Sequence, residues 1–313
     1  MEIKVLSVVT SKYAPFYQDQ CESLENKGVK INHISPSKQS PEQGMGGKGT
    51  SSRGVFDYAK AYTKILQNQS KDYDLVHVNN GLISALGLLQ TTRPIVLTAW
   101  GSEFRDSSLK KINQLSSRLY DEVIVPSPSM IPEVPGDVSV VPFGIDTDLF
   151  KPIPQEEARE EIGWESNDNI VLFPYPPERG VKNFELASAV VESLSTETTL
   201  KTLSGVPHDR VPLYMNASDA VLVTSKAESG PMTVKEAACC NVPVVSTDVG
   251  FTNSVLRNVN HSYVCESKSQ LSQRLEEVLD VGCRSDGRKF AEEWSLDRMG
   301  NELLNVYRKS LNE

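Results

Sequence analysis

The segment 219–250, DAVLVTSKAESGPMTVKEAACCNVPVVSTDVG, is the most informative about the fold class. It opens with an apolar run at 219–225 and closes with a second one at 242–248, and both are typical of strands buried on two faces of a sheet. Between them, a Gly-Pro turn leads into a helix predicted over 231–240, with Pro231 at a favoured first helical position. The order strand, helix, strand predicts a parallel sheet.

The same alternation continues in both directions along the chain. The apolar runs predict further strands over 3–10, 29–35, 74–78, 94–100, 122–127, 139–144, 169–174, 199–205 and 262–266. The intervening segments predict helices over 18–28, 55–69, 81–90, 182–194, 211–217, 267–281 and 296–311. We therefore expect an α/β protein with two Rossmann-like parallel-sheet domains that face each other across a cleft.

The pattern is interrupted once, near 145–168, by Pro152, Pro154 and a charged run. A chain of 313 residues is long enough for two domains. We expect an N-terminal domain over 1–145 and a second domain over 146–295. The amphipathic C-terminal segment 296–313 is predicted to pack back on the first domain.

Composition and charge narrow the class of protein. No apolar run approaches the roughly 20 residues of a membrane span, and the start MEIKVLSVV lacks the features of a signal peptide. We therefore expect a cytoplasmic protein. The net charge of −9 argues against nucleic acid as a partner. Residues 1–145 carry a net +1 and residues 146–313 a net −10. This division is compatible with weak docking of the first half on anionic lipid at the inner face of the cell membrane.

The five cysteines and four histidines show no metal-ligand spacing, so no zinc site is expected. No other metal is expected either, because no Asp-x-Asp stands at a strand end beside the predicted donor site. Asp146 and Asp148 lie in the linker and are expected to cap it. The segment 36–54 is rich in Gly, Ser, Lys and Gln and predicts a loop.

The turn inside 219–250 has the chemistry of an anion site. A helix that begins behind a glycine turn, at the carboxyl end of a strand, directs backbone N–H groups at a diphosphate. Glu228 lies at the same mouth, and Glu236 lies inside the helix. Two carboxylates beside a phosphate cradle suit a sugar on one side and a ribose on the other, because carboxylates accept paired hydrogen bonds from vicinal hydroxyls.

The chain resembles the retaining GT-B glycosyltransferases, specifically glycosyltransferase family 4. Glu228 and Glu236 match the E-x7-E motif of that family in spacing and context. The other similar stretches are DLVHVNNG (74–81), VLTAWGSEF (96–104), VPFGIDTDLFKP (141–152) and PVVSTDVG (243–250). The resemblance implies metal-independent transfer of a sugar from a nucleotide-diphosphate sugar, with retention of configuration. It assigns the donor to the second domain and a glycan or lipid-linked acceptor to the first.

The resemblance also implies individual roles. Glu228 holds hydroxyls of the donor sugar, Glu236 holds the ribose, and Val206 lines the nucleobase. The sugar and diphosphate are held by Ser229, Gly230, Pro231, Met232 and Thr233. No cofactor is implied beyond the nucleotide sugar, with UDP-sugars slightly favoured, and the oligomeric state is left open.

Without a metal, cationic groups have to neutralise the departing diphosphate. The family uses an Arg and a Lys after the first donor-domain strand, where this chain has LFPYPPERGVKN (172–183). Arg179 and Lys182 are the candidates, with Arg179 in the place of the family's Lys in one register. The alternative is a solvated basic pair at a helix N-terminus, which the helix dipole disfavours.

Three residues are candidates for the acceptor side: His77, Trp100 and Glu103. Trp100 stands where many family members have His, and it can stack on a sugar but cannot transfer protons. His77 is expected at the end of a strand on the rim of the cleft, where it acts in catalysis or is simply a hydrogen-bonded structural histidine.

Three other functions compete with transfer. A sugar-nucleotide epimerase on the same fold would bind the same donor. A catalytically degenerate sugar-nucleotide binding subunit would agree with Trp100 and with the altered basic stretch. A Rossmann dehydrogenase is disfavoured, because TSKYAPF (10–16) after the first strand contains no glycine.

Overall fold

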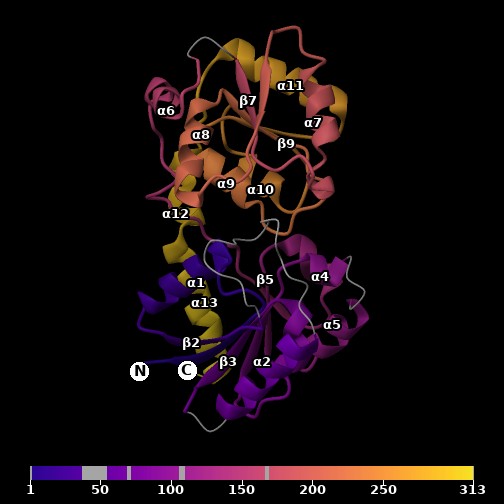
Figure 1. The fold of residues 1–313 in the computed structure, drawn as a ribbon, viewed down its shortest axis with the longest axis vertical. Coiled ribbons are helices and arrows are strands. Elements are labelled where there is room, and N and C mark those ends of the chain that lie inside the picture. The colour runs from indigo at the N-terminus through magenta and orange to yellow at the C-terminus, as the bar shows by residue number, and fades with distance from the viewer. Residues whose placement is uncertain (1, 37–54, 69–71, 106–109, 166–168, 313) are drawn as a thin grey trace. The chain divides into compact units, whose positions relative to one another are not determined.

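The computed structural model describes residues 2–36, 55–68, 72–105, 110–165 and 169–312. The chain forms two compact units, Met1–Gly144 with Leu296–Glu313, and Ile145–Ser295 (Figure 1). Nearly all of the predicted loop 36–54 lies outside the described residues.

The first unit is built on a six-stranded sheet with the order β2-β1-β3-β4-β5-β6, in which all neighbours pair in parallel. Its strands are β1 (Lys4–Val9), β2 (Lys30–Ile34), β3 (Leu75–Asn79), β4 (Ile95–Thr98), β5 (Glu122–Val125) and β6 (Val138–Val140). Its helices are α1 (Pro15–Glu25), α2 (Val55–Asn68), α3 (Ser84–Gly87), α4 (Ser102–Arg105), α5 (Lys110–Ser117) and α13 (Leu296–Leu311). Two 3₁₀ turns, η1 (Gly81–Ile83) and η2 (Pro128–Glu133), complete the unit.

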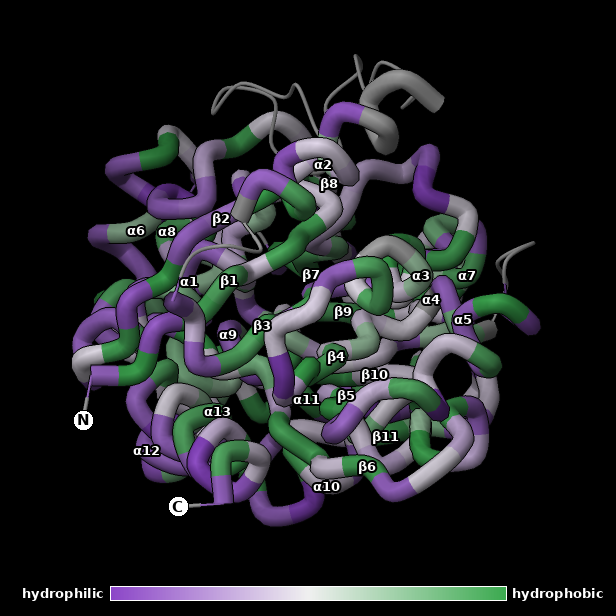
Figure 2. Tube along the Cα trace, turned by 90° about the horizontal axis from the view of Figure 1, so that it is seen from below, coloured by the Kyte–Doolittle hydropathy of each residue, from purple (hydrophilic) through white to green (hydrophobic). Residues whose placement is uncertain are grey.

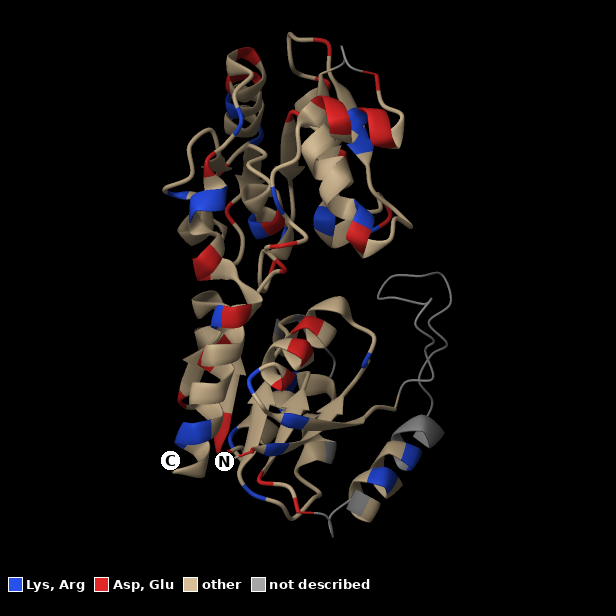
Figure 3. Cartoon of the chain, turned by 90° about the vertical axis from the view of Figure 1, so that its left-hand side faces the viewer, with Lys and Arg blue, Asp and Glu red and all other residues tan. Residues whose placement is uncertain are grey.

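The last helix of the chain belongs to this first unit. In α13, Met299, Leu303 and Tyr307 pack with Val5 of β1 and Leu24 of α1 in one buried cluster. Figure 1 shows the yellow α13 beside the indigo α1, at opposite ends of the sequence. The outer side of α13, the helix ending at C in Figure 3, carries acidic and basic residues.

The second unit is built on a five-stranded parallel sheet with the order β11-β10-β9-β7-β8. Its strands are β7 (Ile170–Phe173), β8 (Thr199–Thr202), β9 (Ala220–Val223), β10 (Val244–Thr247) and β11 (Tyr263–Cys265). Its helices are α6 (Gln155–Ile162), α7 (Phe184–Val191), α8 (Val211–Ala217), α9 (Met232–Cys239), α10 (Thr252–Leu256), α11 (Lys268–Val281) and α12 (Ala291–Trp294). The 3₁₀ turns are η3 (Gly180–Lys182), η4 (His208–Arg210) and η5 (Gly287–Phe290). Side chains of α7 and α11 cover one face of the sheet, and those of α8, α9 and α12 cover the other. The prediction of two parallel-sheet α/β domains is confirmed.

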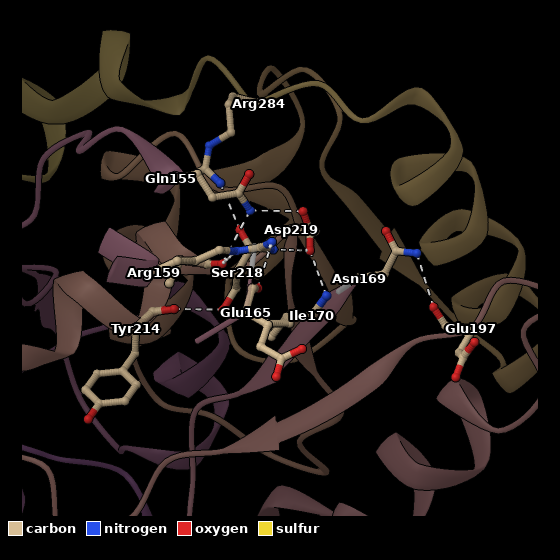
Figure 4. A network of polar contacts seen from close by, with 11 residues as sticks. Gln155, Arg159, Glu165, Asn169, Ile170, Glu197, Tyr214, Ser218, Asp219 and Arg284 are labelled. Atoms are coloured by element: carbon tan, nitrogen blue, oxygen red, sulfur yellow. Dashed lines mark hydrogen bonds and ion pairs between the residues drawn. The ribbon is translucent and has the colours of Figure 1, made fainter. Parts of the chain in front are cut away.

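Short helices account for most of the differences from the predicted elements. The helix predicted over 81–90 is instead η1 followed by the single turn of α3. The charged run in the linker forms α6, which the sequence pattern did not indicate. Arg159 of α6 is buried, and its guanidinium pairs with Asp219 at 2.8 Å and donates to the carbonyl of Ala217 at 2.8 Å (Figure 4). Asp219 also accepts the N–H of Ile170 at 2.6 Å, so one carboxylate joins α6 to β7. These long-range contacts stabilise α6 in its place beside the sheet.

The structure also bears on the linker, the cysteines, metal binding and membrane spanning. Asp146 accepts the N–H groups of Asp148 and Leu149, both at 2.9 Å, which is the capping role expected for the linker. All five cysteines are free. In the part of the chain that the structure describes, no cluster of acidic, His and Cys side chains suits a metal ion, and no helix has the length and apolarity to cross a bilayer.

Candidate active site

The carboxyl ends of β7 and β9 mark the point in the second unit where the strand order reverses. β8 pairs on one side of β7, and β9 pairs on the other. In open parallel sheets, ligands bind outside the carboxyl ends of strands at such a reversal. The segments that leave these two ends, 174–183 and 224–231, carry most of the residues singled out in the sequence.

Glu228 and Lys182 meet at this point. The ammonium of Lys182 forms an ion pair with Oε1 of Glu228, and the Ser225 hydroxyl donates to the same oxygen at 2.7 Å. The Lys182 side chain is only 7% exposed and that of Glu228 only 14%. A carboxylate and an ammonium so removed from water are each stabilised by the other. The structure thus joins Glu228, the candidate for the donor sugar, to Lys182, one of the two candidate cations, although they are 46 positions apart in sequence.

Tyr175 is a further residue of this site, in contact with Lys182. The sequence did not single it out as a site residue. Its buried ring lies below Lys182, with the ammonium 4.0 Å from the ring centroid, a favourable cation–π geometry. Its hydroxyl lies near the Thr233 side chain at the start of α9, which acts to lower the pKa of Tyr175. Burial raises the pKa of Tyr175 well above its usual value, and the charge of Glu228 adds to the effect, so the hydroxyl stays protonated. The available signal was its position in LFPYPPERGVKN (172–183), the stretch that was searched only for cations.

Burial also lowers the pKa of Lys182, whereas the carboxylate of Glu228 acts in the opposite direction and favours the charged ammonium. The protonation of Lys182 therefore depends on its partner.

Hydrogen bonds from two threonine hydroxyls to backbone carbonyls hold the segments of the site together. The Thr224 hydroxyl donates to the carbonyls of Lys182 and Asn183, both at 3.0 Å, and joins the end of β9 to the loop after β7. On the other side, the Thr247 hydroxyl at the end of β10 donates to the carbonyl of Ser225 at 2.7 Å. Because of these ties, Glu228 and Lys182 are carried on segments fixed to neighbouring strands.

The start of α9 differs in detail from the prediction. The helix begins at Met232, and Pro231 is its N-cap and not its first residue. The N–H of Met232 donates to the carbonyl of Gly230 at 2.8 Å, so this amide does not face a ligand as expected. The N–H groups of Thr233 and Val234 lie in the first turn, where an α-helix offers no internal acceptors.

Glu236 lies one turn further along α9 and is 8% exposed. Its charge acts on Tyr175 and Lys182, so it belongs to the same neighbourhood. Arg179 is exposed at the N-cap of η3, and its charge also acts on these two residues. Val206 is half-buried in the loop after β8 and packs against the core beside α9.

The first unit corrects the prediction for His77. This residue lies in the middle of β3, is 1% exposed, and does not face a rim. Its Nδ1 is hydrogen-bonded to the Tyr307 hydroxyl at 2.7 Å and its Nε2 to the Thr98 hydroxyl at 2.6 Å. Both ring nitrogens are thus occupied inside the domain. Packing of α13 over β3 made the difference, and the structural alternative weighed for His77 is the one observed.

Burial lowers the pKa of His77 to about 3. In the unfolded chain the ring takes up a proton near pH 6.5, whereas in the folded chain it stays neutral down to about pH 3, so stability is lost as pH falls through this window. We expect His77→Gln to reduce the dependence of unfolding free energy on pH between 6 and 4 by up to about 1.4 kcal/mol per pH unit. Urea unfolding at several pH values measures it, with His261→Gln, a change at a half-buried histidine in a turn of the second unit, as the control. An identical slope in His77→Gln and the wild type would contradict the assignment.

The prediction that Glu103 serves the acceptor side is also corrected, because its side chain is not available to an acceptor substrate. It is buried, and its Oε1 accepts the N–H groups of Trp100 at 2.5 Å and Gly81 at 3.1 Å. Trp100 itself is half-buried, with its ring edge-on to Phe16 at a centroid distance of 4.7 Å. Among the described residues, its indole nitrogen is buried without a hydrogen-bond partner.

Most of the second unit is similar in sequence to a known protein family. Residues 180–293 match the family described as "Glycosyl transferases group 1". TuaC of Bacillus subtilis (strain 168), whose name assigns it to teichuronic acid biosynthesis as a glycosyltransferase, is 27% identical over 161 residues. That match covers 46% of this chain and 41% of TuaC. The chain spans less than half the length of the curated relatives it matches.

Solved structures resemble the whole chain. A sucrose-phosphate synthase from Thermosynechococcus elongatus superposes with a TM-score of 0.76 at 14% identity, over 98% of both chains. Anabaena HepE in complex with UDP-glucose gives a TM-score of 0.73 at 15% identity, over 98% of this chain and all of that one. At such identities the likeness shows the fold, and that fold is the two-domain GT-B type.

Proposed function

We propose that this chain is a glycosyltransferase that moves a sugar from a nucleotide-diphosphate sugar to an acceptor. The observation that carries the proposal is the buried pair of Lys182 and Glu228 on Tyr175, at the strand reversal of the second unit. Lys182 and Glu228 lie inside residues 180–293, which match the glycosyl transferase family, and Tyr175 precedes that segment. The site brings an acidic group for sugar hydroxyls next to cations for a leaving diphosphate.

The donor roles follow from this arrangement. Glu228 accepts hydrogen bonds from the donor sugar, and its carboxylate is held in place by Lys182 and Ser225. Lys182 and the exposed Arg179 neutralise charge that develops on the diphosphate. The amides of Gly230 and Thr233, with the adjoining residues Ser229, Pro231 and Met232, line the sugar and diphosphate. Glu236 binds the ribose, and Val206 borders the base.

The proposed chemistry needs no metal and no protein base. With retention of configuration, the leaving phosphate takes the acceptor's proton on the face where the sugar–phosphate bond breaks. The cations on the protein stabilise this phosphate, so we propose that EDTA leaves the rate unchanged. Loss of activity with EDTA and its return with Mn²⁺ would contradict a metal-independent mechanism.

The donor is proposed to be a UDP-sugar, and the acceptor a glycan or a lipid-linked glycan. UDP is supported by HepE, whose structure contains UDP-glucose. Trp100 of the first unit remains the candidate for stacking on a sugar, since His77 and Glu103 are both enclosed. The location we propose is cytoplasmic, with peripheral attachment at the inner membrane face.

The proposal is tested by incubating the purified chain with UDP-, GDP- and ADP-sugars and measuring release of the nucleoside diphosphate. Slow hydrolysis of one donor, accelerated by an acceptor, is the expected result. Binding of a sugar nucleotide without hydrolysis or transfer would instead favour a degenerate binding subunit. Interconversion of the sugar with no release of nucleotide would favour an epimerase.

Gly250 provides a test of how closely Glu228 is positioned. Its φ is +62°, and a Cβ there would lie 3.0 Å from the carbonyl oxygen of Glu228. We expect Gly250→Ala to reduce turnover about fivefold to tenfold, because the loop carrying Glu228 must move, and to cost about 1 kcal/mol of stability. Gly163→Ala is the matched control, because Gly163 has φ +72° with nothing within 4 Å of its Cβ position. The control should lose stability but not turnover. Equal turnover in both variants would mean that packing at Gly250 does not position Glu228.

A further inference from the structure

Helix α5 of the first unit has its polarity reversed. Its inward side consists of Asn113, Ser116 and Ser117, all of which are buried. Its outward side carries large aliphatic residues: Ile112 is 50% exposed, Leu115 62%, and Leu119, just after the helix, 63%. A surface helix of a globular domain ordinarily has the opposite arrangement. In Figure 2 the segment labelled α5 has hydrophobic green next to hydrophilic purple.

The buried polar groups of α5 explain why the helix cannot turn over. The Asn113 amide donates to the carbonyl of Glu103 at 2.9 Å. The Ser116 hydroxyl is hydrogen-bonded to that of Ser84 in α3 at 2.6 Å, and the Ser117 hydroxyl donates to the carbonyl of Gln114 at 3.0 Å. The Ser117 bond lies within α5 and would move with it, but rotation of the helix to bury its aliphatic side chains would take Asn113 and Ser116 away from their partners. The Glu103 carbonyl and the Ser84 hydroxyl would then lose these hydrogen bonds inside the domain, which is costly. The outward aliphatic face is therefore built into the fold.

Basic side chains accompany this face. Lys111 and Arg118 are exposed and lie on the same side of α5 as Leu115, because positions 111, 115 and 118 follow the helical repeat. All three line a shallow hollow of about 530 Å³ between α5 and η2, together with Gln114, Pro132, Glu133 and Pro135. Ile131 of η2 adds a further aliphatic residue that is 44% exposed.

We propose that the surface formed by Lys111, Ile112, Leu115, Arg118, Leu119 and Ile131, here termed the α5 surface, docks on an anionic lipid bilayer. Exposed aliphatic side chains flanked by cations are the features with which a helix lies in the headgroup region. A second copy of the chain fits less well, because a two-fold symmetric contact would bring the cations of one copy against those of the other. A polyanionic glycan would use the cations but would leave the aliphatic side chains in water.

The inference deepens one part of the proposed function, the peripheral attachment, and names the surface that carries it. It does not depend on the transfer reaction. Binding to vesicles is measured without any sugar nucleotide, so its failure is distinct from a failure to hydrolyse or transfer.

The experiment is sedimentation of the full chain with vesicles of phosphatidylcholine alone or with 30% phosphatidylglycerol. We expect binding to the anionic vesicles that weakens with salt, and little binding to the neutral ones. Lys111→Gln with Arg118→Gln is expected to lower the partition coefficient about 20- to 30-fold, from about 1 kcal/mol for each charge near the surface. Leu115→Ser with Leu119→Ser is expected to lower it at least about tenfold.

Matched substitutions outside the α5 surface control for general effects. Val281→Ser removes an aliphatic side chain that is 48% exposed in the second unit, and Lys268→Gln removes an exposed cation there. Both should bind vesicles like the wild type, and thermal unfolding of every variant checks that the fold is kept.

Three results would overturn the proposal. The first is no binding of the wild type to anionic vesicles. The second is equal binding by the wild type and both double variants. The third is a concentration-dependent dimer, detected by analytical ultracentrifugation, that Leu115→Ser with Leu119→Ser abolishes while vesicle binding is unaffected.

Discussion

Glu228→Gln is expected to lower turnover by at least about a hundredfold while the affinity for the free nucleoside diphosphate stays nearly unchanged. The substitution keeps the shape of the side chain and removes the charge that pairs with Lys182. In the proposed site this carboxylate contacts the sugar and not the nucleotide, so only donor turnover should suffer. Isothermal titration with UDP and the initial rate of transfer measure the two effects.

The same substitution has an electrostatic consequence at Lys182. Burial lowers the pKa of this ammonium, and Glu228 opposes that effect. Without the carboxylate, the pKa of Lys182 falls further, so Glu228→Gln should lose nucleotide binding at a lower pH than the wild type does. A titration of UDP affinity between pH 7 and pH 10 reveals the shift.

A double-mutant cycle separates the ion pair from its surroundings. Lys182→Met alone leaves the Glu228 carboxylate in a mostly dry site and is expected to cost about 2–3 kcal/mol of stability, somewhat less than for a fully enclosed pair. The double variant Lys182→Met with Glu228→Gln should be more stable than Lys182→Met, because no unpaired charge remains. Additive losses in urea unfolding would mean that the two side chains do not interact in solution.

Glu236→Gln is expected to raise the dissociation constant of the nucleoside diphosphate about tenfold to a hundredfold. A charge-assisted hydrogen bond contributes roughly 1.5–3 kcal/mol, and the amide replaces one acceptor oxygen of the proposed ribose contact by a donor. The side chain is 8% exposed, so little water is at hand to compensate for the lost contact.

Glu185→Gln is the matched control for Glu236→Gln, because Glu185 is an exposed glutamate in the first turn of α7. It should bind UDP like the wild type. An equal loss of UDP affinity in Glu228→Gln and Glu236→Gln would remove the proposed division between sugar and ribose. No loss in Glu236→Gln would exclude the start of α9 as the nucleotide site.

The candidate site was only partly predictable from sequence. Glu228 and Lys182 were each singled out, but their pairing depends on β9 lying next to β7, which the order of elements along the chain does not specify. Tyr175 was visible only as a residue of LFPYPPERGVKN (172–183), where the sequence singled out Arg179 and Lys182. Its role as a support for Lys182 emerges from a ring placed 4.0 Å below an ammonium.

The two parallel sheets could be predicted from the order of residues alone, since long apolar strand runs separated by helical segments can be buried in few other ways. The sequence also predicted that Glu228 precedes a helix N-terminus behind a glycine turn. Which side chains are enclosed, and which of them meet, depends on long-range packing that the sequence pattern does not show. His77 is sealed by Tyr307 of α13, and α5 turns its aliphatic side outward. Periodicity records how a segment alternates between two environments, but long-range packing decides which environment lies on each side.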